Sequence, residues 1–191
     1  FDVTQDKAKQ RVNVFGALKK GYHSLAEIMG EYPAGIPVQD AVWMFRRMMG
    51  ALIAVHRAGF VHGAGLPQHV QVGLMDKTEP GAHNGVLTDF NYAVRRGQPL
   101  KAMVSGYTIY YPEEVQNKAP STFGTDLFMA SKCFENLVGG QVNMPRQILG
   151  IVRACQLGPR HRLQDVQELY DDFDTVVKAV YGKPAFRLFT I

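Results

Sequence analysis

The sequence predicts a mainly α-helical domain with a few short β-strands, and two observations indicate this class. The first is an apolar stripe with helical spacing over residues 38–53, which predicts a long amphipathic helix at the centre of the core. The second is that helical patterning dominates the rest, over residues 125–138, 145–157 and 163–181. Strand patterning is confined to three short stretches, residues 11–15, 70–74 and 85–88.

Local signals mark the ends of a further short helix and of the long helix. Ser24 followed by Glu27 is a capping-box pattern, so a short helix is expected to begin there and to stop before Pro33. Pro37 suits the first turn of the long helix, and Gly59 suits its C-terminal end.

Length and composition predict one domain. The chain has 191 residues, 46% hydrophobic and 20% charged, which is enough for one sizeable core. Residues 1–10 are polar and without periodicity, so we expect a disordered lead-in before a domain over residues 11–191. Because the chain begins with Phe1 rather than Met, we expect it to be a piece of a longer protein.

Several classes are disfavoured. No apolar run reaches the roughly 18 residues that span a bilayer, and no signal peptide is visible, so we expect no membrane association and a cytoplasmic location. The net charge of +4 comes from scattered basic residues without interleaved aromatics, which leaves nucleic-acid binding a minor alternative. Cys133 and Cys155 lie in apolar helical patterns, which predicts buried thiols in a reducing compartment rather than a metal site.

A series of short motifs follows the long helix. In chain order they are Phe60-Val61-His62-Gly63, Thr88-Asp89-Phe90-Asn91, Tyr111-Pro112-Glu113, Asp126 at the head of a helical segment, and the run from Cys155 to Leu163. This order resembles the C-terminal lobe of the eukaryotic-type protein kinase fold, with its H-R-D-L-x-x-x-N and D-F-G motifs. The resemblance covers the chain from about residue 11 onward.

The resemblance implies an architecture. Residues 11–20 would be the last strand of the N-terminal lobe and the hinge, and the rest of that lobe is largely absent from this chain. Phe90 and Asp126 would be structural residues, with Asp126 tying its helix to the catalytic loop. Glu113 and Arg162 would form an ion pair; the alternative is two unrelated surface charges.

The same resemblance implies that most catalytic-loop chemistry is missing. His62 retains the loop histidine, and Gly63 replaces the usual arginine. Ala64 stands at the catalytic aspartate and cannot accept a proton. Leu66 replaces the loop lysine. His69 stands at the asparagine that holds the second magnesium, although Mg²⁺ prefers oxygen ligands.

The nucleotide and metal positions are also altered. Gln71 stands where an aliphatic residue forms the floor under adenine, so adenine binding there is doubtful. Asp89 is the one retained metal ligand, and Asn91 replaces the glycine of D-F-G. No G-x-G-x-x-G precedes residue 60, and no V-A-I-K lysine is identifiable within residues 1–30.

Three hypotheses follow. The first is a catalytically impaired kinase-like domain, a pseudokinase, that acts without a cofactor as a binding, scaffolding or regulatory module. Its partner would be a protein or other domains of the parent chain. The second is an unconventional serine/threonine-type kinase or nucleotide-binding phosphotransferase that uses ATP, Mg²⁺ and Asp89, with Ser105, Thr108 and Tyr110 as self-modification sites. The third is a helical interaction domain unrelated to kinases.

Overall fold

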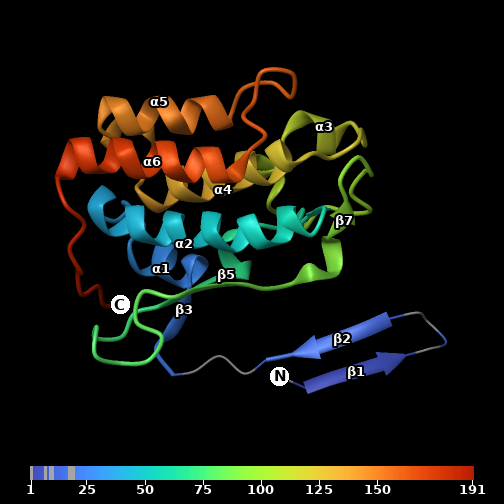
Figure 1. Ribbon diagram of the computed structural model, residues 1–191, viewed down its shortest axis with the longest axis horizontal. Helices are drawn as coiled ribbons and strands as arrows, with labels where there is room; N and C mark the ends of the chain where they lie inside the picture. The colour runs from blue at the N-terminus through green and yellow to red at the C-terminus, as the bar shows by residue number, and fades with distance from the viewer. Residues whose placement is uncertain (1, 7, 9–10, 17–19) are drawn as a thin grey trace.

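The computed structural model describes residues 2–6, 8, 11–16 and 20–191, and helices are the main regular structure of this part of the chain. The ribbon in Figure 1 shows the helices stacked above a small group of strands. The helices are α1 (Leu25–Glu31), α2 (Val38–Arg57), α3 (Glu113–Gln116), α4 (Phe123–Leu137), α5 (Arg146–Cys155) and α6 (Val166–Tyr181). In the part of the chain that the structure describes, four single 3₁₀ turns lie between them, η1 (Pro67–His69), η2 (Phe90–Tyr92), η3 (Thr108–Tyr110) and η4 (Gln141–Asn143).

Within the described residues, the strands form three small antiparallel sheets. They are β1 (Asp2–Asp6) with β2 (Arg11–Phe15), then β3 (Tyr22–Ser24), β5 (Val70–Gly73) and β6 (Gly85–Leu87) in the order β3-β5-β6, and β4 (Phe60–Val61) with β7 (Val94–Arg95). The strands expected near residues 11–15, 70–74 and 85–88 are confirmed.

Two expectations about strands are wrong. The described residues contain seven strands rather than three: β3, β4 and β7 are so short that they leave little pattern in a sequence, and β1 lies in the polar lead-in. The polar lead-in contains β1, whose register with β2 runs from Asp2 opposite Phe15 to Asp6 opposite Arg11. Backbone pairing of this kind satisfies N–H and C=O groups without requiring apolar alternation. The expected hinge at residues 15–20 lies partly outside the described residues.

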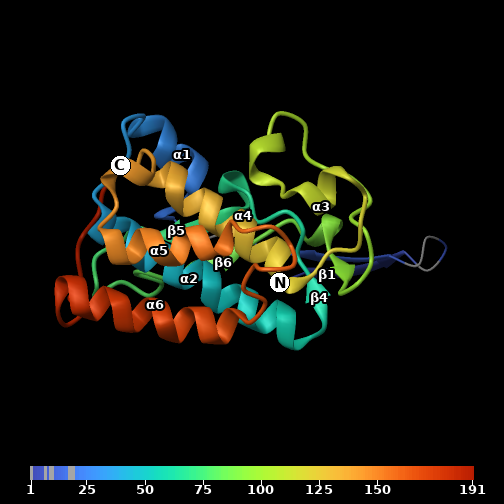
Figure 2. The ribbon, with the colours of Figure 1, turned by 90° about the horizontal axis from the view of Figure 1, so that it is seen from above.

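Helix α2 is the centre of the core, as its apolar stripe predicts. Figures 1 and 2 place α2 against α4 and α6 on one side and against the β3-β5-β6 sheet on the other. The ring of Phe45 lies 4.9 Å from Phe134 of α4 and 5.0 Å from Phe173 of α6. These three buried rings join the helices, since aromatic pairs at such distances add to the energy of burial.

The predicted helix signals are confirmed. Ser24 caps α1 by accepting a hydrogen bond from the Glu27 N–H at 3.1 Å, and the Glu27 carboxylate accepts the Ser24 N–H at 2.6 Å. Pro37 precedes the first turn of α2, and Gly59 follows its end with φ +81°, a left-handed value that glycine adopts without strain.

The prediction that both cysteines are buried is confirmed. Cys133 and Cys155 are buried and free, and burial raises the pKa of both thiols above the usual range. Within the described ranges, the structure contains no helix with the length and hydropathy required to traverse a bilayer.

Candidate functional site

The candidate site is the loop over residues 62–69, and a buried carboxylate on α4 holds its start. The Asp126 side chain accepts the backbone N–H of His62 at 2.8 Å and that of Gly63 at 2.9 Å. It also lies 2.9 Å from Nε2 of His56, at the end of α2. Asp126 is in the first turn of α4, where the helix dipole favours a negative charge. The expected tie between this helix and the loop is therefore present, with His56 as a further partner.

His62 connects this loop to the segment that contains Asp89. Its Nδ1 accepts the backbone N–H of Ala64 at 3.2 Å, so the proton of the neutral ring lies on Nε2 and is donated to the Thr88 carbonyl at 3.0 Å. The Phe90 ring packs edge-on at 4.6 Å. Burial lowers the pKa of His62, which favours this neutral form. A neutral, fully buried histidine with both nitrogens bonded serves as a structural link.

The Asp89 carboxylate is engaged by two neighbouring side chains. Nε2 of His69 lies 3.2 Å from Oδ2 of Asp89, and Asn91 donates to Oδ1 at 2.6 Å. Nδ1 of His69 lies 2.8 Å from the carbonyl oxygen of Ala64, which can only accept. Both ring nitrogens therefore face acceptors, and both contacts are hydrogen bonds when the ring carries both protons. In that form His69 and Asp89 are an ion pair.

The backbone at Asp89 is unusual. Its φ of +60° and ψ of +63° are left-handed, a conformation that aspartate adopts more readily than most non-glycine residues. The 3₁₀ turn η2 begins directly after it. This geometry directs the Asp89 side chain toward His69 and Asn91.

The middle of the loop is closed. Ala64 and Leu66 are fully buried, and Sγ of Cys133 donates to the Gly65 carbonyl at 3.2 Å. Gly63 has φ +70°, and a Cβ there would lie 2.4 Å from a methyl carbon of Leu100. The segment after residue 96 therefore packs directly against the loop, so position 64 offers a buried methyl group and no acid or base.

The remaining predicted residues differ in outcome. Gln71 is half-buried on β5, and its side-chain amide donates to the Gln68 carbonyl at 3.1 Å. This polar side chain does not form the apolar surface on which an adenine ring would lie. Ser105 and Thr108 are exposed. Tyr110 is buried, and burial raises its pKa to about 12, so its hydroxyl is a poor candidate for modification.

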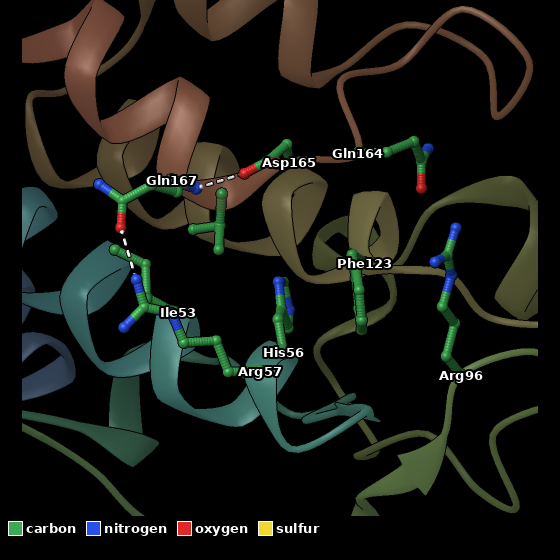
Figure 3. Close-up of a pocket in the computed structure, with 9 residues that line it drawn as sticks. Ile53, His56, Arg57, Arg96, Phe123, Gln164, Asp165 and Gln167 are labelled. Atoms are coloured by element: carbon green, nitrogen blue, oxygen red, sulfur yellow. Dashed lines mark hydrogen bonds between the residues drawn. The ribbon is translucent and has the colours of Figure 1, made fainter.

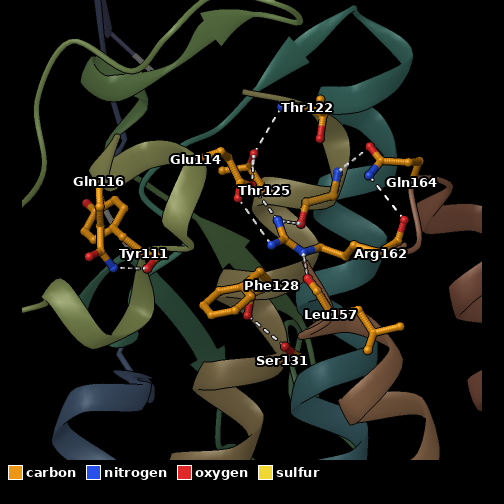
Figure 4. Close-up of polar contacts among 11 residues, drawn as sticks. Tyr111, Glu114, Gln116, Thr122, Thr125, Phe128, Ser131, Leu157, Arg162 and Gln164 are labelled. Carbon is orange, nitrogen blue, oxygen red and sulfur yellow. Dashed lines mark hydrogen bonds and ion pairs between the residues drawn. The ribbon is translucent and has the colours of Figure 1, made fainter. Parts of the chain in front are cut away.

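Arg162 forms an ion pair, but its partner is Glu114 rather than the expected Glu113. Arg162 forms a bidentate pair with Glu114, not with Glu113, and its second contact, from Nη2 to Oε2, is 3.3 Å. Figure 4 shows Glu114 and Arg162 meeting above Phe128, with Thr125 also donating to Glu114 at 3.0 Å. The expectation for Glu113 is wrong because Glu113 faces solvent from the first turn of α3 while Glu114 is buried.

A cavity of about 420 Å³ lies between the end of α2 and the starts of α4 and α6. His56 lines it, and Figure 3 shows the Phe123 ring between His56 and Arg96, at 4.3 Å from the imidazole and 4.7 Å from the guanidinium carbon. A second cavity, of about 530 Å³, is apolar and borders Phe90. Neither cavity is lined by Ala64 or by Asp89.

The sequence did not indicate the contacts of three residues, namely His56 with Asp126, Asn91 with Asp89 and Glu114 with Arg162. His56 had a signal, because it continues the buried face of α2 one turn beyond Leu52. Considering only the described parts of the chain, we find no cluster of three or more His, Cys, Asp or Glu side chains that could hold a metal ion.

Comparison with known proteins adds no assignment. The chain matches no protein-family model and has no significant match among curated protein sequences.

Proposed function

We propose that the chain is the C-terminal lobe of a kinase-like domain that does not transfer phosphate and acts as a binding or regulatory module. The observation that carries the proposal is the contact between His69 and Asp89. At the two positions where the kinase resemblance implies metal ligands, these side chains contact each other. When the His69 ring carries both protons, it supplies the positive charge that a divalent cation would otherwise bring to the carboxylate.

The surroundings of Ala64 support the loss of catalysis. Phosphoryl transfer depends on positioned metal ions and on a residue that orients the attacking hydroxyl. A fully buried methyl group supplies no such residue, and the fully buried Leu66 supplies no charge for the phosphate.

The retained contacts support a scaffold role for the loop. Asp126 holds two successive backbone N–H groups, and His62 joins the loop to Thr88 and Phe90. These interactions need no ligand, so the loop keeps its shape without nucleotide. Binding through surfaces is the function that such a rigid, closed loop favours.

The competing reading is an unconventional phosphotransferase, and one feature favours it. About 27% of the Asp89 side chain remains exposed, so a metal ion could still approach that carboxylate. In that case phosphotransfer should be measurable, and Asp89→Ala should abolish it.

The test restores the missing groups one at a time in the longest available protein that carries this chain. Ala64→Asp alone should give no phosphotransfer from radiolabelled ATP, because Leu66 and His69 remain. Ala64→Asp/Leu66→Lys/His69→Asn tests whether the frame still supports transfer. Activity of the unmodified protein that is lost in Asp89→Ala would sink the proposal.

A further inference from the structure

The C-terminal segment after α6 crosses the molecule and is held by side chains far away in the sequence. In Figures 1 and 2 it leaves α6, passes the loop between β5 and β6, and ends near α1. Residues 183–191 have no regular secondary structure. Three contacts hold this tail.

The first contact is an aromatic stack. The His83 ring lies parallel to Trp43 of α2 at 3.9 Å, and the Phe186 ring of the tail stacks on His83 at 4.1 Å. Nε2 of His83 lies 2.8 Å from the Arg187 carbonyl and therefore donates to it. Arg47 donates to the backbone carbonyl of His83.

The second contact is a bidentate ion pair. Arg187 Nε lies 2.6 Å from Oδ1 of Asp40, and Nη2 lies 3.3 Å from Oδ2. The Asp40 side chain is only 7% exposed, whereas that of Arg187 is 46% exposed. A buried carboxylate without a cationic partner is costly, so this position selects for a guanidinium in whatever lies there.

The third contact is an apolar anchor. Phe189 is buried, its ring lies 5.5 Å from Tyr32, and the Tyr32 hydroxyl donates to the Thr190 carbonyl at 2.9 Å. Leu188, between the anchors, is 58% exposed. We call the surface formed by Tyr32, Asp40, Trp43 and His83 the groove. Its contacts accommodate an aromatic residue, an arginine, any residue and a second aromatic residue, in that order.

The groove and its occupant differ in rigidity. Asp40 and Trp43 belong to the 20-residue core helix α2, and Tyr32 directly follows α1. In the tail, Phe189 is the one buried residue between residues 183 and 191. The tail therefore depends on these few contacts, and a segment with little buried surface is expected to open at a lower free-energy cost than the core helices.

We infer that the groove formed by Tyr32, Asp40, Trp43 and His83 is a docking site for an extended segment of a partner protein with the pattern aromatic-Arg-x-aromatic. The chain's own residues 186–189 fill it in the absence of the partner and compete with it. The inference uses none of the kinase-like motifs, so it stands independently of the function proposed above.

Trp43 is the single tryptophan of the chain, so its fluorescence reports directly on the groove. The probe is a synthetic peptide with the sequence of residues 182–191. Arg187→Ala/Phe189→Ala in the full chain releases the tail, and Leu188→Ala is the matched control that leaves it in place. The peptide should change Trp43 emission saturably in the released variant and bind the unmodified chain and the control about tenfold more weakly.

Two specificity arms follow from the contacts. A peptide with alanine at the position of Arg187 should bind the released variant about tenfold more weakly, and so should the original peptide on a released variant that also carries Asp40→Asn. Equal binding of both peptides would overturn the inference. So would equal binding by the released and unmodified chains, or tail exchange between two copies, seen as a concentration-dependent dimer, in place of peptide capture.

A second measurement covers the case in which the released variant does not fold. With the unmodified chain, a large excess of peptide should raise amide hydrogen exchange of residues 183–191 while exchange in β5 stays unchanged. Unchanged exchange in the tail at saturating peptide would contradict the inference.

Discussion

The carboxylate of Asp126 accepts the backbone N–H of His62 at 2.8 Å across 64 residues of sequence. The same side chain accepts the N–H of Gly63 at 2.9 Å, so two successive backbone groups of the loop are held by one buried side chain. This relationship determines the shape of the candidate site, and it leads to the first prediction.

Replacing Asp126 should destabilise the fold strongly. Asp126→Ala leaves the N–H groups of His62 and Gly63 and the His56 ring without their shared acceptor, so the free energy of unfolding should fall by about 3–5 kcal/mol. Urea denaturation followed by circular dichroism measures it. Asp172→Ala, at an exposed position on α6, is the control and should change stability by less than about 0.5 kcal/mol. Similar losses in the two variants would contradict this role for Asp126.

Glu113 and Glu114 should differ sharply when each is replaced. Glu114→Ala leaves the buried guanidinium of Arg162 without its carboxylate and should cost about 3–5 kcal/mol of unfolding free energy. Glu113→Ala removes an exposed charge and should cost less than about 0.5 kcal/mol. The same denaturation series compares these adjacent residues. A larger loss at Glu113 would restore the original pairing expectation.

His62 should make the fold sensitive to mild acid. Because burial lowers its pKa in the folded state, the unfolded chain binds the proton more readily than the folded chain. The contribution is complete above the unfolded pKa of about 6.5 and is lost as pH falls toward the folded pKa, at up to about 1.4 kcal/mol per pH unit.

The measurement is the free energy of unfolding at about pH 7.5 and about pH 5.5 for the unmodified chain and for His62→Gln. The decrease should be smaller in the variant. His83, whose pKa burial also lowers, contributes in the same direction in both proteins, so the difference between them isolates His62. Parallel decreases would show that His62 does not carry the effect.

Features that depend on the residues of a single helix were predicted well from the sequence. The apolar stripe of α2 and the Ser24 capping box depend on residues within a few turns, and the structure has both. The strand pair β5–β6 and the tie from Asp126 to the loop also agree with expectation.

What failed depends on contacts between distant segments. Glu113 and Glu114 are adjacent in the first turn of α3, and only the position of Arg162 decides which one is buried. His69 and Asp89 are 20 positions apart, and no pattern in the sequence near either residue indicates that their side chains would contact each other. The anchors of the C-terminal tail left no pattern, because each contacts a different element.

The most direct test of the central claim is the titration of the longest available protein that carries this chain with ATP and Mg²⁺ by isothermal calorimetry, alongside its Asp89→Ala variant. If His69 and Asn91 hold the Asp89 carboxylate, neither protein should bind ATP and Mg²⁺ more tightly than about 1 mM. Micromolar binding by the unmodified chain that disappears in Asp89→Ala would contradict the account and favour a working nucleotide site.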